Sequence, residues 1–456
     1  MAGIGFELRK LMKRDSYLSI LQAYTYAGII SSGPWVLSIA AVLIIGIISI
    51  PAVTPLGQVS QFQVSITYLI AVSLIFTGLV QLAFTRYSAD RIFAKEHFRL
   101  LPNLNGLLLV VAVVGGAPAF PLAIILFPGT PLIFRMLFAT SFVVLCCVWV
   151  TAILLSGLKA YKAILLNFAV GYGISLLLSF ILRKWNLEGL MLAFLLGQFV
   201  LLNGMLLVLF RNYPSYSFVE FDFFKRDRVH LSLVFTGFFY NLGIWSDKLV
   251  FWFHPYTGNH VIGPLNASFI YDLPVFLAYL SILPGMAVFL VRMETDFVEY
   301  YDRFYDAVRE GGSLSYICEM KDEMVRTARV GIYEIIKIQA IAAIAVVLLG
   351  EKLLKFAGIP VIYLPLLYVD VAAAGFQVVF LGILNIYFYL DRRGRALFLT
   401  ALFAFLNLAL SWVSILMGPY FYGYGFAVSL CLVIMSGMLL LDRDFRNLEY
   451  ETFMLQ

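Results

Sequence analysis

The sequence predicts an all-α polytopic membrane protein, with twelve transmembrane helices in two six-helix lobes and both termini in the cytoplasm. Three observations lead to this prediction. The composition is 62% hydrophobic and 13% charged, and the mean hydropathy of +0.92 excludes an ordinary soluble domain. The apolar residues form long runs, and the basic residues gather between alternate runs.

Twelve apolar runs are near or above the length that a helix needs to cross the hydrocarbon core, roughly 20 residues. Six lie in residues 17–228 and six in residues 229–456, so we predict an N-terminal and a C-terminal lobe with these bounds. The predicted spans are 17–50, 59–84, 104–127, 132–155, 163–182, 189–210, 231–253, 262–291, 331–349, 359–390, 396–417 and 420–441.

The distribution of lysine and arginine sets the orientation, because cytoplasmic segments of membrane proteins carry an excess of these residues. With the N-terminus inside, all but six of the 32 lysines and arginines fall on the cytoplasmic side. The exceptions are Arg135, Arg183, Lys184, Lys248, Lys352 and Lys355. This asymmetry accounts for the net charge of +5 without a nucleic-acid partner.

The residues before the first span and those near its middle each have a distinct pattern. Residues 1–16 are predicted to form an amphipathic helix on the cytoplasmic surface, with bases opposite its apolar side. No small-residue cleavage pattern follows, so we expect an uncleaved first span. Near its middle this span contains Gly33 and Pro34, where the loss of a backbone hydrogen bond predicts a kink or break. Interrupted helices often lie on transport paths, although membrane helices also tolerate proline.

The sequence lacks the motifs of common enzyme classes. It contains no phosphate-binding GxxxxGK[ST], no HExxH and no GxSxG. The spacing of the four cysteines fits neither a disulfide framework nor a metal-binding motif. We therefore predict a transporter rather than an enzyme, with no catalytic residue, no metal site and no cofactor.

Three spans of the second half contain an aspartate, namely Asp247, Asp272 and Asp370. At helical rise each lies about 9 to 16 Å from the outer end of its span. A charge there costs about 2.5–3.5 kcal/mol even on the lenient insertion scale, so it usually has a partner or faces a cavity. We predict that the acids converge with Lys248 on a substrate path or cation site, coupled to Na+ or H+. The alternative is that each acid only fixes helix packing.

Two helix faces combine aromatic rings with hydrogen-bonding groups, as a sugar-binding surface requires. At helical spacing, the predicted glycan-lining residues are Tyr24, Ser31 and Trp35 in the first span and Asn241, Trp245 and Trp252 in the seventh. Packing or anchoring at the membrane interface is the alternative for any single ring.

Residues 292–330 form the one long cytoplasmic loop of the prediction. Aromatic residues recur in it at helical spacing until Gly311 and Gly312, among them Phe297, Tyr301 and Phe304. This pattern indicates an amphipathic helix with two alternative uses. It lies on the lipid surface, or its aromatic stripe docks a soluble partner.

The opening residues, MAGIGFELRKLMKRDSYLSILQAYTYAGIISSGPWVLSI, resemble the PelG family, the polytopic subunits of the Pel exopolysaccharide system of Gram-negative bacteria. The length and the span count agree with this family over the whole chain. The family is grouped with the MATE-like flippases of the multidrug/oligosaccharidyl-lipid/polysaccharide superfamily. The resemblance implies two lobes around a central cavity, with the first and seventh helices in its wall.

The resemblance also implies a function and partners. It implies export of an amino-sugar-rich polymer through the bacterial inner membrane for the biofilm matrix. The implied partners are the cytosolic glycosyltransferase PelF and the membrane subunits PelD and PelE. In MATE transporters a cation site uses acids of the seventh and tenth helices, where this sequence has Asp247 and Asp370. The adjacent Lys248 departs from a plain cation site.

Two other functions fit the same sequence. One is a flippase for a lipid-linked oligosaccharide, which takes a finished unit rather than a growing chain. The other is a scaffold without transport activity that recruits a glycosyltransferase through residues 292–330. A hydrated cavity between the lobes favours transport, whereas tight packing of the lobes and a flat cytoplasmic patch favour the scaffold.

Overall fold

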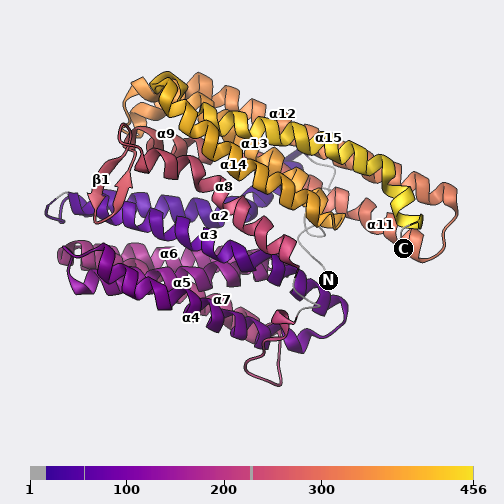
Figure 1. Ribbon diagram of the computed structural model, residues 1–456, viewed down its shortest axis with the longest axis horizontal. Helices are drawn as coiled ribbons and strands as arrows, with labels where there is room; N and C mark the ends of the chain where they lie inside the picture. Colours follow the sequence, from indigo (N-terminus) through magenta and orange to yellow (C-terminus); the bar gives the residue numbers. More distant parts are fainter. Residues whose placement is uncertain (1–16, 56, 226–229, 455–456) are drawn as a thin grey trace. The chain divides into compact units, whose positions relative to one another are not determined.

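The computed structural model describes residues 17–55, 57–225 and 230–454, and these residues are mostly helical (Figure 1). The predicted helix 1–16 lies outside the described residues. The first half contains α2 (Tyr17–Ser49), α3 (Gly57–Phe93), η1 (His97–Arg99), α4 (Leu100–Leu126), α5 (Leu132–Gly157), α6 (Tyr161–Leu182), η2 (Arg183–Trp185), α7 (Asn186–Asn212) and η3 (Asp222–Phe224).

The second half adds one small β-hairpin to a series of helices. Its elements are α8 (Leu231–Phe253), β1 (Asn259–Ile262), β2 (Leu265–Ala267), α9 (Phe269–Leu280), α10 (Leu283–Val291), η4 (Arg292–Phe297), α11 (Val298–Arg309), α12 (Leu314–Phe356), η5 (Val361–Tyr363), α13 (Leu364–Tyr389), α14 (Arg393–Met417), η6 (Pro419–Phe421) and α15 (Tyr424–Met454).

Contacts divide the chain into two compact units. Unit 1 consists of Met1–Ser32, Ser246–Phe251 and Phe269–Gln456, and unit 2 of Gly33–Trp245 and Trp252–Ser268. The divisions fall inside α2 and inside α8, so each of these helices contributes to both units. The predicted lobes, 17–228 and 229–456, have other bounds than these units. The predicted boundary lies in the loop before α8, whereas the units divide within α2 and within α8. The two lobes stay a prediction.

Unit 2 is a helical bundle in which α5 packs against α3, α4 and α7. Helices α6 and α7 form a close pair, because Gly171 and Gly197 let their backbones approach each other. A Cβ atom on Gly197 would lie 2.5 Å from the carbonyl oxygen of Gly171. Asn186, with φ of 55°, reverses the chain between the two helices. The two glycines therefore allow close backbone contact, which larger side chains at these positions would prevent.

The beginning of the predicted eighth span is a β-hairpin rather than a helix. Strands β1 and β2 pair antiparallel, and Ile262 faces Leu265 in the register. The hairpin belongs to unit 2, where the hydroxyl of Tyr68 donates a hydrogen bond of 2.8 Å to the carbonyl oxygen of Asn266. The helical part of this span begins only at Phe269. Gly263 and Pro264 are turn residues that favour a hairpin over a helix, so hydropathy alone misplaced the start.

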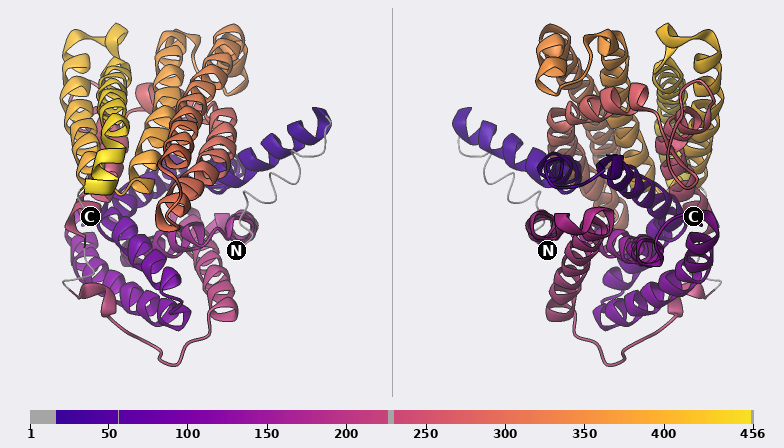
Figure 2. Two further views of the ribbon diagram at one scale, coloured as in Figure 1. Left: turned by 90° about the vertical axis from the view of Figure 1, so that its right-hand side faces the viewer. Right: turned by 90° about the vertical axis from the view of Figure 1, so that its left-hand side faces the viewer.

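Unit 1 is centred on α13, which packs against α9, α12 and α15. Helices α14 and α15 run side by side, in gold and yellow in Figure 2. The helices α9 and α10 form a pair bent by 42°, with Pro284 in the first turn of α10. Helix α2 is bent by 59° between Gln22–Pro34 and Val36–Ser49. Pro34 removes a hydrogen bond within α2, whereas Pro284 stands in the first turn of α10, where proline can begin a helix but cannot continue α9.

Eight helices of the described residues are long and apolar enough to cross a membrane, or ten if each of two bent pairs forms one span. This count takes residues 161–212 as one helix, although α6 and α7 are separate, and it omits α8. The chain is a multi-pass membrane protein. Twelve spans and cytoplasmic termini stay predictions.

The predicted loop 292–330 is helical over most of its length. The helix α10 continues through the π-helical turn η4 into α11, and α12 then begins at Leu314 and continues without a break to Phe356. Gly311, with φ of 71°, makes the turn between α11 and α12, as the two glycines predict. Figure 1 shows α11 and the start of α12 beside the end of α15. The segment is therefore a helical hairpin, which we call the polar hairpin.

Candidate functional site

A buried ion pair lies on α8 in unit 1. Asp247 is fully buried and Lys248 is 7% exposed. The Lys248 Nζ lies 3.0 Å from Oδ2 and 3.2 Å from Oδ1 of Asp247. Adjacent helix residues point about 100° apart, so the pair forms because the long lysine side chain reaches back around the helix. The lysine therefore supplies the partner that a buried aspartate needs.

Two other helices complete the hydrogen bonds of Asp247. The hydroxyl of Tyr271 on α9 donates a 2.6 Å hydrogen bond to Oδ2. The amide of Asn407 on α14 donates to Oδ1 at 3.3 Å, and Ser411 Oγ donates to the Asn407 side-chain oxygen at 3.0 Å. The Tyr271 ring stacks on Phe251, one turn after Asp247, with a centroid distance of 3.8 Å. The carboxylate thus accepts hydrogen bonds from three side chains whose positions are fixed by packing.

The ammonium of Lys248 is surrounded by aromatic rings. Its Nζ lies 5.1 Å from the ring centroids of both Tyr279 and Phe426, and it donates a 3.4 Å hydrogen bond to the Tyr279 hydroxyl. Cation–π contacts of this kind contribute about 2 kcal/mol when the cation is desolvated. These contacts add to the attraction of Asp247 in stabilising the buried ammonium.

Asp370 on α13 is the second acid of this cluster and has a different environment. It is 1% exposed, and among the described residues neither of its carboxylate oxygens has a hydrogen-bond partner. It lies close enough to Asp247 and Lys248 to interact with their charges. Gly423, with φ of 83°, lies against it, and a Cβ there would be 2.8 Å from Asp370 Oδ1. Buried carboxyl groups usually accept a hydrogen bond, so Asp370 is an exception within the described residues.

The structure brings together two of the three predicted acids. Asp272 lies in the first turn of α9, is only half-buried, and shares none of the hydrogen bonds described for Asp247. The residue before it, Tyr271, contacts Asp247 instead. The three hydrogen-bonding residues Tyr271, Tyr279 and Asn407 were not predicted. Asn407 could have been found, because an amide in an apolar span needs a partner; the tyrosines could not, because the chain has 26 of them.

The predicted glycan-lining residues of α8 belong to unit 2, and their glycan-lining role stays a prediction. Trp252 is buried and stacks on Tyr68 in unit 2 at a centroid distance of 4.5 Å, and Trp245 contacts Trp252 at 6.1 Å. The Asn241 amide donates a 3.0 Å hydrogen bond within α8, to the carbonyl oxygen of Gly237. These contacts give the stripe of α8 a packing role in unit 2.

The predicted stripe on α2 is described only in part. Ser31 Oγ donates a 3.3 Å hydrogen bond to the carbonyl oxygen of Gly28. Tyr24 is half-buried and lines a cavity in unit 1. The side chain of Trp35 lies outside the described residues. A glycan-lining role for this stripe stays a prediction.

The aromatic stripe of the polar hairpin faces the interior of unit 1, so these rings do not form the exposed docking surface that was one of the two predicted uses. Phe297 and Phe304 are fully buried, and Tyr301 packs on Tyr389 of α13 with a centroid distance of 5.4 Å. The helical spacing predicted the helix, but α12 and α13 supply the partner for its apolar face. The exposed face of α11 is polar and includes Asp302, Arg303 and Asp306.

Comparison with known proteins identifies a family match over nearly the whole chain. Residues 1–453 match the family described as "PelG: Putative exopolysaccharide Exporter (EPS-E)". No curated protein sequence matches the chain.

Several solved structures share the fold. An outward-facing multidrug resistance MATE family transporter of the MOP superfamily gives a TM-score of 0.65 at 14% identity, over 94% of this chain and 97% of that chain. A MATE structure in the bent conformation gives 0.64 at 16% identity, over 98% of both chains. A MOP superfamily transporter from Pyrococcus furiosus Vc1 (DSM3638), described as having a binding pocket of reverse polarity, gives 0.59 at 15% identity, over 94% of this chain and 96% of that one. At these identities the likeness establishes the MATE-like fold alone.

Proposed function

Because the chain belongs to the PelG family of exopolysaccharide exporters, we propose that it exports an amino-sugar-rich, Pel-type polysaccharide to the periplasm. The membrane crossed is the bacterial inner membrane, and the polymer is destined for a biofilm matrix. The family and the MATE-like fold support membrane transport rather than catalysis. The fold does not define the cargo, so the substrate is part of the proposal.

The buried charge cluster of unit 1 is the observation that carries a coupled mechanism. Asp247 has donors from three side chains, whereas Asp370 has none among the described residues. The charges of Asp247 and Lys248 cancel each other. The total charge of the cluster therefore depends on whether Asp370 holds a proton.

We propose that Asp370 gains and loses this proton during export. The protonated form leaves a neutral cluster. The ionised form adds a negative charge in an apolar region, which attracts Lys248 away from Asp247 and favours another arrangement of the helices. The two charge states can thus favour two conformations, as coupling requires. The donor set supports a proton over Na+, because a hard cation generally needs about six oxygen ligands and the oxygens of Asp247 already accept hydrogen bonds.

The proposed partners follow from the family. They are a cytosolic glycosyltransferase, PelF, and the membrane subunits PelD and PelE. The polar hairpin supplies a surface that fits a soluble partner, because the exposed face of α11 carries charges of both signs. Its buried aromatic stripe supports this surface from within and does not contact the partner.

Export at matched protein level tests the coupled mechanism. The variant Asp370→Asn keeps the size of the side chain but cannot ionise. We expect normal insertion and at least a tenfold loss of polymer export, because the site is held in one charge state. Export by the unchanged protein should also stop when a protonophore collapses the proton gradient.

Asp272→Asn is the matched control, since Asp272 is an acid of the same unit outside the cluster. It should export within twofold of the unchanged protein. Normal export by Asp370→Asn would reject proton coupling at this residue. Export that persists in the protonophore but depends on Na+ would identify the cation instead.

A further inference from the structure

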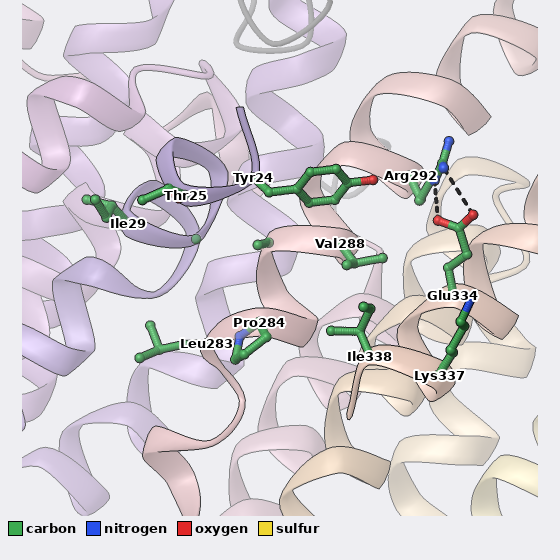
Figure 3. Close-up of a pocket in the computed structure, with 12 residues that line it drawn as sticks. Tyr24, Thr25, Ile29, Leu283, Pro284, Val288, Arg292, Glu334, Lys337 and Ile338 are labelled. Carbon is green, nitrogen blue, oxygen red and sulfur yellow. Dashed lines mark hydrogen bonds and ion pairs between the residues drawn. The ribbon is translucent and has the colours of Figure 1, made fainter. Parts of the chain in front are cut away.

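A cavity of about 680 Å³ lies within unit 1 between α2, α10 and α12 (Figure 3). All of its lining residues belong to unit 1. It is separate from the charge cluster of Asp247, since neither Asp247 nor Asp370 lines it.

One end of the cavity is polar. Arg292 Nε and Nη2 donate hydrogen bonds of 2.5 and 3.0 Å to the carboxylate of Glu334, and its Nη1 donates to Asp296 at 2.6 Å. The hydroxyl of Tyr24 points toward Arg292 in Figure 3. Lys337 lies one turn after Glu334 and is exposed. It has no ion pair among the described residues, whereas Arg292 is held by two carboxylates, so the Lys337 ammonium is the cation at this end that a ligand can pair with.

The other end of the cavity is apolar. It is formed by Ile29, Leu283 and Ala287, with Ile338 on the α12 side. At helical rise, the distance from Leu283 to Arg292 along the helix is about 13 Å. The cavity therefore offers a charged end and an apolar end separated by roughly the length of a glycerol group and the first part of an acyl chain.

The surroundings of the cavity are also apolar. Beyond Ile338, the outer face of α12 exposes Ile341, Ile344 and Leu348, at 54%, 59% and 77%. These residues lie in the predicted span 331–349, so this face contacts lipid. In the predicted topology, Glu334 and Lys337 lie near the cytoplasmic start of the same span, at the level of the head groups. A lipid that enters this cavity from the bilayer would place its head group at the charged end.

We propose that this cavity binds an anionic phospholipid from the cytoplasmic leaflet. The ammonium of Lys337 pairs with the phosphodiester, the Tyr24 hydroxyl donates a hydrogen bond to it, and one acyl chain lies along Ile29 and Leu283. A phosphodiester supplies the anionic partner that the Lys337 ammonium lacks among the described residues. A juxtamembrane lysine contributes about 1 kcal/mol to attraction by anionic lipid, so the site selects lipids by charge as well as by shape.

Lipid retention by the purified full-length protein tests this proposal. Native mass spectrometry would count bound phosphatidylglycerol and phosphatidylethanolamine during titration from mixed micelles. We expect phosphatidylglycerol to bind the unchanged protein at least fivefold more tightly. Lys337→Gln should lose about fivefold in that affinity, as the loss of one charge contact predicts. Lys352→Gln is the matched control, because Lys352 is exposed near the other end of α12, and it should change the affinity by less than twofold.

A second pair of variants tests the apolar end without a change of charge. Ile338→Trp fills the cavity and should also weaken phosphatidylglycerol binding at least fivefold. Ile341→Trp, one turn further along the same face, should not. Equal binding of the two lipids, or equal losses in Lys337→Gln and Lys352→Gln, would overturn the proposal. Full competition by soluble glycerol phosphate would show a free phosphate site and would overturn it as well.

Discussion

The two compact units bury polar groups of different kinds. Among the described residues, the buried carboxylates and lysine are Asp247, Lys248, Asp370 and Asp444, and all four belong to unit 1. Unit 2 buries one histidine, His254, and its other buried polar groups are mainly serines, threonines and amides, such as Ser73, Thr77 and Gln198.

The difference follows from what each kind of group needs. In unit 2, Thr77 donates a 2.7 Å hydrogen bond to the carbonyl oxygen of Ser73 one turn earlier, and Trp149 donates a 2.9 Å hydrogen bond to Ser73 Oγ. Such bonds are satisfied within a helix or between two neighbours. The cluster of unit 1 instead needs side chains from α8, α9 and α14 to hold one ion pair. Buried neutral groups are therefore satisfied by near neighbours, whereas the buried ion pair depends on side chains from three helices.

The sharpest way to test this comparison is to replace Lys248 by methionine, which keeps the length of the side chain but removes the charge. Asp247 would then be buried without its cation, and breaking a buried pair from one side costs about 3–5 kcal/mol. We expect a large loss of thermal stability in detergent. Adding Asp247→Asn to Lys248→Met should recover much of the loss, because it removes the unpaired charge. Equal instability of the single and double variants would contradict this explanation.

The matched change in unit 2 should have a much smaller effect. The side chain of Gln198 is fully buried, and neither its oxygen nor its nitrogen has a hydrogen-bond partner among the described residues. Gln198→Met removes two unsatisfied polar atoms at similar volume, so we expect a change within about 1 kcal/mol, neutral or stabilising. Thermal unfolding beside Lys248→Met measures the contrast. A loss as large as that of Lys248→Met would show that unit 2 also depends on a buried polar network.

An ion pair of the polar hairpin should have the smallest effect. Lys321 Nζ lies 2.6 Å from Glu449 Oε1, with the glutamate side chain 37% exposed. This hydrogen bond lowers the pKa of Glu449, so its contribution is present above the ordinary pKa of glutamate and is lost as pH falls through the lowered value. Exposed pairs contribute about 0.2–1 kcal/mol. Glu449→Gln should therefore lower stability slightly at pH 7 and by less at pH 3, measured by thermal unfolding at both values. A larger deficit at pH 3 would contradict the assignment.

The sequence by itself determined the class of the protein and the location of its charges along the chain. Long apolar runs imply membrane helices whatever their neighbours are, because unpaired backbone groups are too costly in lipid. An aspartate and a lysine within such a run are visible without a structure for the same reason. The opening residues of the chain also resembled the PelG family, and the family match confirms that prediction.

Only the tertiary structure decided which of these groups meet. The β-hairpin makes α9 begin at Phe269, and that start turns Tyr271 toward Asp247 and leaves Asp272 half-exposed. Likewise, helical spacing predicted α11, but the packing of Tyr301 on Tyr389 shows that its aromatic face is internal. Depth in a span follows from sequence position. The direction of a side chain depends on where its helix starts and on what packs against it, and distant parts of the chain supply both.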